Sequence, residues 1–167
     1  RKTGIFLEES KRYYVDKRIV ERIIATDCES FREYFMLVRF QANGIEMQNL
    51  INIMTVNETY FFRESYQFDC LVQHLLAERV RHKGAGETLK IWSLPCSTGE
   101  EIYSIAIYLL ENWPLINRYD VELIGSDIDT NVLNMAMKGV YAKRSLHAVP
   151  SHIINKYFIQ KNENTFQ

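Results

Sequence analysis

Strand-like and helix-like segments alternate between residues 89 and 138, and this alternation constrains the fold most strongly. The runs 89–94 and 120–127 have the length and composition of strands, whereas 99–113 and 130–138 have the apolar spacing of helices. A strand, a helix and a second strand in this order form a right-handed crossover in a parallel sheet. Because two strands cannot bury their own faces, we expect the sheet to continue beyond residue 167.

The residues before this alternation carry a helical pattern only. Periodic apolar side chains predict helices at 8–25, 27–40 and 45–54, and a longer helix at 65–83. The apolar side chains expected on the inward face of the longer helix are Phe68, Leu71, Val72, Leu75, Leu76 and Val80.

These patterns predict an α/β chain with two domains. We expect a small all-helical N-terminal domain at 1–54 and a linker segment with a long helix at 55–86. Residues 87–167 then form the first part of a Rossmann-like domain with a parallel sheet.

Composition and charge restrict the partners. The net charge of −1 gives no support to a nucleic-acid partner, which a strongly basic domain would indicate. The three cysteines, Cys28, Cys70 and Cys96, lie far apart without the spacing of a zinc site, so reduced thiols and no bound metal are expected. No apolar run approaches the roughly 18 residues that cross a membrane. The sequence therefore predicts a cytoplasmic protein without membrane insertion.

Two acidic loops follow the two predicted strands, where ligands of open α/β sheets bind. The loop 95–101 contains a single glycine, Gly99, followed by Glu100 and Glu101. The GxGxxG pattern is absent and the two carboxylates would repel a pyrophosphate, which weighs against a nicotinamide-dependent oxidoreductase. The pair suits a ligand with hydroxyl groups or positive charge. Alternatively, the two glutamates only favour the first turn of a helix.

The second loop, 126–130, places Asp127 at the tip of its strand. A carboxylate there can accept hydrogen bonds from both hydroxyls of a ribose. Asp127 or Asp129 could instead be the N-cap of the following helix. Together the two loops predict a site for a nucleoside without pyrophosphate, and the sulfonium-bearing S-adenosylmethionine fits.

The segment 55–68 surrounds polar side chains with aromatic ones. Aromatic rings exclude water, Asn57 and Thr59 offer an amide and a hydroxyl, and Arg63 can fork onto a carboxylate. We interpret the segment as a wall of the nucleoside pocket. The alternative is a linker whose aromatic residues join two cores.

Four stretches together resemble the family of chemotaxis-receptor glutamate methyltransferases, CheR. They are TVNETYFFRE, IWSLPCSTGEEIYSIAI, GSDIDTNVLNMAMKGVY and the N-terminal KTGIFLEESKRYYVDKRI. The resemblance implies an all-helical domain joined to a truncated Rossmann-like methyltransferase domain. Where the family commonly has Ala-Ala before the cysteine and proline after the two glutamates, this chain has Leu94-Pro95 and Ile102.

The resemblance also implies an activity and a set of site residues. The activity is S-adenosylmethionine-dependent O-methylation of glutamate side chains in the cytoplasmic helical region of chemoreceptors, with S-adenosylhomocysteine as product. Asn57, Thr59 and Arg63 match cofactor-contacting positions, and Arg63 also matches a position near the transferred methyl group. Asp127 and either Glu100 or Glu101 match acidic cofactor contacts. A catalytically incomplete module that binds the cofactor as a sensor or scaffold is the alternative.

A basic stripe on the first helix is a candidate surface for the receptor. Lys11, Arg18 and Arg22 are separated by seven and four residues, which return to nearly the same angle on a helix. Residues 1–24 hold seven Lys and Arg and four acidic residues, a net charge of +3. The stripe could steer a glutamate-rich receptor helix, or it could be only a solvated helix face.

Overall fold

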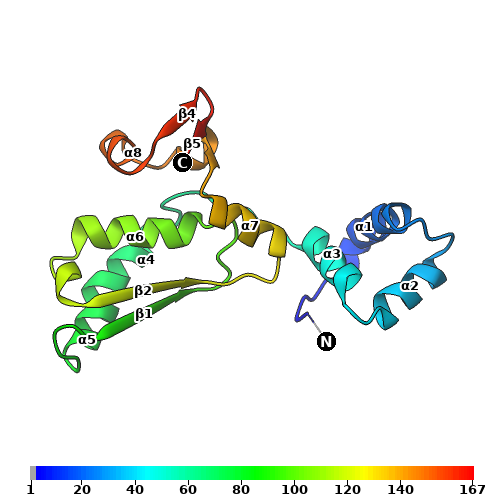
Figure 1. Cartoon of the computed structure of the whole chain (residues 1–167), viewed down its shortest axis with the longest axis horizontal. Coiled ribbons are helices and arrows are strands. Elements are labelled where there is room, and N and C mark those ends of the chain that lie inside the picture. The colour runs from blue at the N-terminus through cyan, green and yellow to red at the C-terminus, as the bar shows by residue number, and fades with distance from the viewer. Residues whose placement is uncertain (1–2) are drawn as a thin grey trace. The chain divides into compact units, whose positions relative to one another are not determined.

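A computed structural model describes residues 3–167 (Figure 1). These residues form two compact units. The first unit contains residues 3–56 and Ile128–Asn131, and the second contains Asn57–Asp127 and Val132–Gln167. The first unit is helical and the second combines helices with a parallel pair of strands, which confirms the predicted α/β class.

Three helices and one helical turn form the first unit. They are η1 (Glu9–Lys11), α1 (Arg12–Ala25), α2 (Phe31–Phe40) and α3 (Ile45–Met54). The helix α2 begins after Ser30, whose Oγ accepts a hydrogen bond from the amide of Glu33 at 3.2 Å. Of the apolar residues of α1, Ile19 and Ile23 are half-buried and Val20 is exposed.

A buried carboxylate joins the three helices. Glu46 of α3 accepts two hydrogen bonds from the guanidinium of Arg22, at 2.9 and 2.7 Å, and one from Tyr34 of α2 at 3.0 Å. Burial alone would raise the pKa of Glu46, but hydrogen bonds from Arg22, Asn49 and Tyr34 outweigh it and hold the pKa below its ordinary value. This network fixes the packing of the helical unit.

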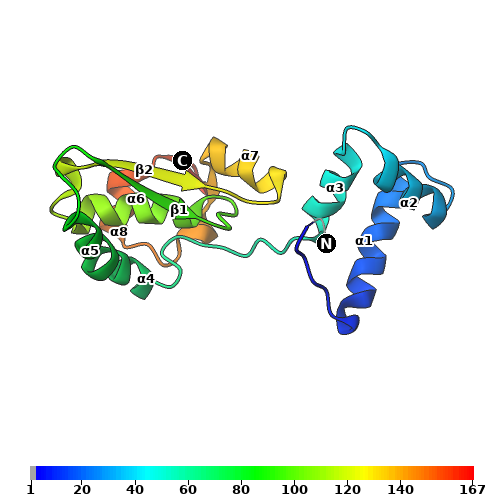
Figure 2. The same cartoon turned by 90° about the horizontal axis from the view of Figure 1, so that it is seen from below.

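The second unit is built on two parallel strands. β1 (Thr88–Ser93) and β2 (Asp120–Gly125) pair in register from Thr88 opposite Asp120 to Ser93 opposite Gly125. The connecting helix α6 (Glu100–Asn112) and the short turn η3 (Ile116–Arg118) lie between them in the chain. Figures 1 and 2 show α6 running along the strands with the helical segment before β1 beside it.

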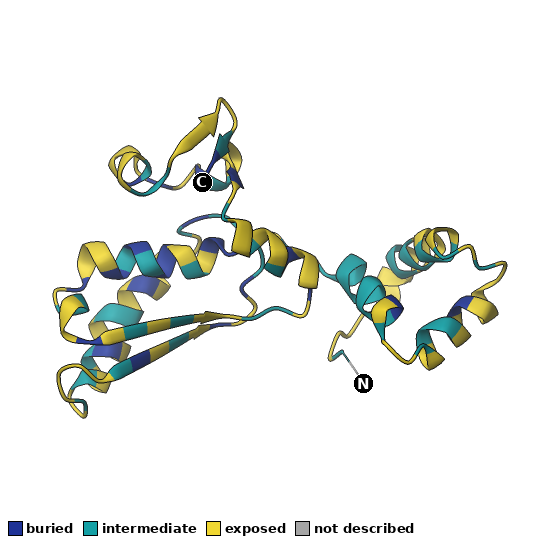
Figure 3. Cartoon of the chain, in the orientation of Figure 1, coloured by how far each residue is buried: buried dark blue, intermediate teal, exposed yellow. Residues whose placement is uncertain are grey.

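The helix α6 packs between two apolar clusters. Leu109 and Trp113 join Leu89 of β1 in one cluster, and Ile107 joins Phe61 and Leu146 in the other. Buried positions therefore occur on two sides of α6, and Figure 3 marks the buried residues along this helix in dark blue. A helix held on both sides gives the loop at its N-terminus a fixed position.

The predicted helix 65–83 contains an irregularity that the sequence did not reveal. It consists of α4 (Tyr66–Cys70), the π-helical η2 (Leu71–Leu76) and α5 (Ala77–Val80). Phe68 and Leu76 are buried as expected, but Leu75 is 61% exposed, so its predicted inward orientation is wrong. A π-turn contains more residues than an α-turn and shifts the helical phase, which turns Leu75 outward.

The C-terminal part contains three short strands that the sequence pattern did not predict. β5 (Thr165–Phe166) pairs antiparallel with both β3 (Tyr141–Ala142) and β4 (Gln160–Asn162). The helical elements of this part are α7 (Thr130–Lys138), η4 (Lys143–Leu146) and α8 (Ser151–Tyr157). Strands of two or three residues are too short to show an alternating pattern.

Candidate functional site

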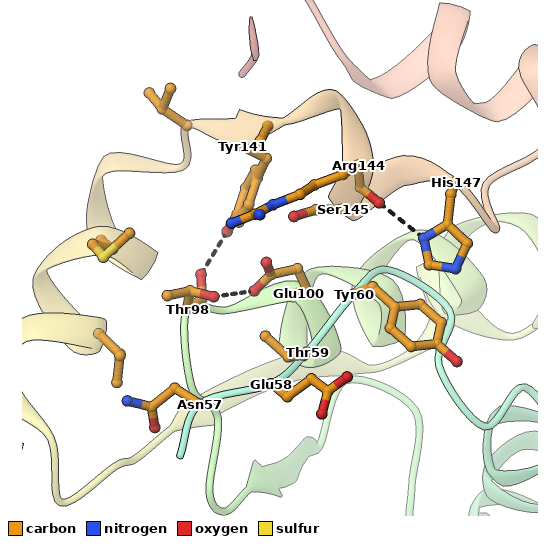
Figure 4. A pocket seen from close by; sticks show the side chains of 14 residues that line it. Asn57, Glu58, Thr59, Tyr60, Thr98, Glu100, Tyr141, Arg144, Ser145 and His147 are labelled. Carbon is orange, nitrogen blue, oxygen red and sulfur yellow. Dashed lines mark hydrogen bonds between the residues drawn. The ribbon is translucent and has the colours of Figure 1, made fainter. Parts of the chain in front are cut away.

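An open pocket of about 620 Å³ lies in the second unit (Figure 4). It is formed by the segment 57–60, the loop after β1, the helix α7 and the turn η4. Its lining consists of Asn57, Glu58, Thr59, Tyr60, Thr98, Glu100, Val132, Met135, Val140, Tyr141, Ala142, Arg144, Ser145 and His147. The pocket combines an apolar side on α7 with several polar and charged groups.

The two strand-end loops are hydrogen-bonded to each other. The amide of Cys96 donates to the carbonyl of Ser126 at 2.9 Å, and the amide of Ser97 donates to the carboxylate of Asp127 at 2.8 Å. The predicted proximity of the two loops is thus present in the structure. Burial, and then the charge of Asp127, raise the pKa of the Cys96 thiol, so this cysteine is no activated nucleophile.

Gly99 serves packing within this loop. Its φ of 95° is left-handed, and a Cβ there would lie 3.0 Å from both the Tyr141 hydroxyl and the Cβ of Ala136. The absent side chain therefore lets the loop pack against α7 and Tyr141.

The two adjacent glutamates have different positions. Glu100 is 3% exposed, lines the pocket and accepts a hydrogen bond from the Thr98 hydroxyl at 2.5 Å. Glu101 is exposed and accepts a hydrogen bond from Ser93 at the end of β1 at 2.8 Å. Of the pair, Glu100 is the one positioned to meet a ligand in the pocket.

The two aspartates after β2 are also distinguished. Asp129 is 2% exposed and accepts hydrogen bonds from the Asn131 amide and the Thr55 hydroxyl, both at 2.8 Å. It directly precedes α7 and caps that helix, as one of the two sequence interpretations had it. Asp127 instead lies in the loop beside Ser97. It is not among the residues that line the pocket.

The segment after residue 56 brings two of its three predicted polar residues to the pocket. Asn57 and Thr59 line the pocket, and the Asn57 carbonyl accepts a hydrogen bond from the Ser97 hydroxyl at 3.4 Å. Arg63 is exposed and outside the lining. Its guanidinium donates to the Glu58 carbonyl at 2.7 Å and lies 5.9 Å from the ring centre of Tyr60. Arg63 thus contacts two pocket residues, Glu58 and Tyr60, without lining the pocket itself.

The structure adds residues from the region after α7 that were not selected from the sequence. The hydroxyl of the buried Tyr141 donates to the Thr98 carbonyl at 3.0 Å, and burial, followed by the charge of Glu100, raises the pKa of this tyrosine. Arg144, Ser145 and His147 complete that side of the pocket. The only sequence signal for them was the basic, polar run that follows the Gly-Val-Tyr of the third resembling stretch.

One of the three residues of the predicted basic stripe, Arg22, is paired with a buried carboxylate within the helical unit. Arg22 is bonded to Glu46, and only 20% of its side chain is exposed, so its charge is used within the fold. Arg18 pairs with Glu21 at 2.9 Å, and Lys11 lies in η1, just before α1. The position of Arg22 conflicts with an outward-facing docking role. The docking prediction therefore rests on Lys11 and Arg18.

Among residues 3–167, no group of three His, Cys, Asp or Glu side chains is arranged to hold a metal ion. No helix of that range has the length and apolar content required to cross a bilayer.

Comparison with known proteins agrees with the architecture. Residues 1–55 match the family model "CheR methyltransferase, all-alpha domain", and residues 57–167 match "CheR methyltransferase, SAM binding domain". SAM is S-adenosylmethionine, the cofactor that this second domain binds.

Curated relatives extend the match over almost the whole chain. The chain is 52% identical to chemotaxis protein methyltransferase 2 of Vibrio cholerae over 99% of its own length and 57% of the relative. It is 38% identical to chemotaxis protein methyltransferase 2 of Pseudomonas aeruginosa (96% and 55%) and 36% identical to the chemotaxis protein methyltransferase of Escherichia coli (95% and 53%). The chain thus spans a little over half the length of these relatives. With both domain models matched in order and the two strand-end loops brought together, the chain belongs to the CheR methyltransferase family.

Proposed function

We propose that the protein transfers a methyl group from S-adenosylmethionine to glutamate side chains of chemoreceptors. The observation that carries the proposal is the pocket in which the buried Glu100 lies together with Asn57 and Thr59. The names of the relatives, chemotaxis protein methyltransferases, support a chemotaxis protein as the acceptor.

The residues of the pocket fit S-adenosylmethionine. A volume of about 620 Å³ falls within the range of small-molecule sites. The carboxylates of Glu58 and Glu100 suit a ligand that carries a sulfonium and an ammonium group, and Val132, Met135 and Val140 suit an apolar ring. We infer that Asp127 accepts hydrogen bonds from the ribose hydroxyls, beside the Ser97 amide that it already binds.

Methyl transfer to a glutamate carboxylate requires no catalytic acid, base or nucleophile from the protein. A glutamate side chain has an ordinary pKa of about 4.3 and is an anion at neutral pH. One of its oxygens forms a bond to the methyl carbon, the carbon–sulfur bond breaks, and its electron pair returns to sulfur, so no proton moves. Alignment and exclusion of water can supply roughly 7–11 kcal/mol in favourable cases. The pocket residues are therefore assigned binding and positioning roles.

Methyl transfer by the full-length protein tests the proposal. The protein is incubated with methyl-labelled S-adenosylmethionine and the cytoplasmic domain of a chemoreceptor, and base-labile label on the receptor is measured. A receptor domain with its methylation-site glutamates replaced by alanine is the matched control. Label that requires those glutamates is expected. Tight cofactor binding without transfer to receptor would instead identify a sensor or scaffold.

A further inference from the structure

Arg144 is a cation that the family match leaves without a role. It lies in η4, its side chain lines the pocket, and the guanidinium takes part in none of the ion pairs formed among residues 3–167. Figure 4 shows its guanidinium extending across the pocket on the side opposite Asn57 and Glu58.

The backbone that carries Arg144 is firmly held. The carbonyl of Ser145 accepts a hydrogen bond from the Phe61 amide at 2.9 Å, and Leu146 is 3% exposed in the core. The Arg144 carbonyl lies 2.8 Å from Nδ1 of His147, whose ring packs against Tyr60 with 4.5 Å between ring centres. The guanidinium thus extends from a turn that is held by a backbone hydrogen bond and by the buried side chain of Leu146.

The charge of the lining explains why a cation is needed there. The lining carries two carboxylates, Glu58 and Glu100, and Arg144 is its one arginine or lysine. Two carboxylates favour a cationic methyl donor but repel an anionic acceptor. A guanidinium offsets this repulsion and offers paired donors in the geometry that a carboxylate accepts.

We propose that Arg144 binds the side-chain carboxylate of the acceptor glutamate and directs one of its oxygens toward the methyl group. The proposal deepens the proposed function and rests on it. Arg144 is then a substrate-positioning residue on the η4 side, while Asn57, Thr59 and Glu100 hold the methyl donor on the other. An uncharged glutamine at the same receptor position offers one acceptor oxygen and no negative charge, so Arg144 binds it more weakly and favours glutamate over glutamine.

The test uses the full-length protein with the substitution Arg144→Gln and a chemoreceptor cytoplasmic domain as acceptor. We expect the KM for receptor to rise about tenfold or more, as for the loss of a charge-assisted hydrogen bond, while the Kd for S-adenosylhomocysteine changes by less than about twofold. Arg144→Lys should recover only part of the loss, because a point charge cannot replace the fork. Lys143→Gln, with the same change in charge at an adjacent exposed residue outside the lining, should behave as wild type.

The possible results separate three conclusions. If Arg144→Gln weakens S-adenosylhomocysteine binding and leaves the receptor KM unchanged, the guanidinium holds the carboxylate of the methyl donor and the proposal is overturned. Wild-type values for both quantities would also overturn it and show a solvated side chain. If the wild-type protein transfers no methyl group to receptor, the proposed function fails, and the role of Arg144 fails with it.

Discussion

The two units contain charged clusters that are arranged in opposite ways. In the helical unit, Glu46 receives hydrogen bonds from Arg22, Tyr34 and Asn49 and is 3% exposed. In the second unit, Glu100 is equally buried but faces an open pocket, and Arg144 forms no ion pair among the described residues. Partners within the chain make the first cluster a structural element, whereas we infer that the second cluster offers its charge to a ligand.

Substitution of Glu46 should produce the largest effect. Glu46→Ala removes the carboxylate that Arg22 and Tyr34 share and leaves a largely buried guanidinium without its counterion. We expect a loss of about 3 kcal/mol in the stability of the helical unit. Hydrogen exchange of α1–α3 in the full-length protein measures it, and the second unit should keep its exchange rates. Unchanged exchange in α1–α3 would show that the pair contributes nothing net.

Acid should weaken the same cluster by a smaller amount. The pKa of Glu46 is lowered in the folded state, so its contribution is complete above the unfolded value of 4.5 and is lost as pH falls through the folded pKa. Because Glu46→Ala has no carboxylate to protonate, its helical unit should lose less stability than wild type between pH 5 and about 3. Equal pH slopes for the two proteins would contradict this assignment.

Substitution of Asp127 tests the proposed cofactor contact in the second unit, at the loop after β2. Asp127→Ala should weaken S-adenosylmethionine binding at least about tenfold, because a charge-assisted hydrogen bond to the ribose is lost. Asp127→Asn can still accept the Ser97 amide and should be intermediate. Calorimetry on the full-length protein gives both affinities. Wild-type affinity of the Ala variant would mean that Asp127 only connects the two loops.

These clusters also show what the sequence could predict. The periodic apolar side chains predict the helix 45–54 with its observed bounds. The two strands and their acidic loops were predicted because strand, helix and strand alternate. Arg144 and His147 escaped because hydrogen bonds distant in sequence, Phe61 to Ser145 and Tyr141 to Thr98, bring them to the pocket. The pairing of Arg22 with Glu46 depends likewise on helix packing.

Arg63 differs from both Arg22 and Arg144, because it contacts two pocket residues but does not line the pocket itself. Arg63→Ala should lower kcat by roughly tenfold and cofactor affinity by less, because the Glu58 carbonyl and the Tyr60 ring lose their support. Arg63→Lys should not restore full turnover, because a lysine has no planar guanidinium to lie over the Tyr60 ring. Steady-state kinetics and calorimetry separate the two effects. Equal turnover of the Lys variant and wild type would rule out a role for the planar guanidinium.

The smallest effect is expected on the surface of the helical unit. Lys11 and Arg18 keep the docking prediction, because Arg22 is engaged with Glu46. The double reversal Lys11→Glu and Arg18→Glu should raise the KM for receptor only roughly threefold and leave cofactor affinity unchanged, because Lys11 is exposed and the half-buried Arg18 is already paired with Glu21. The matched control reverses Arg12 and Lys17, which make the same change in charge away from the stripe.

Ionic strength separates steering from local damage in this double reversal. The Debye length falls from about 10 Å at 0.1 M salt to about 3 Å at 1 M, so a steering effect should disappear at high salt. A defect in the fold of α1 would persist there, since screening does not restore lost packing. If the stripe variant and the control variant have the same KM at low salt, the stripe is a solvated helix face.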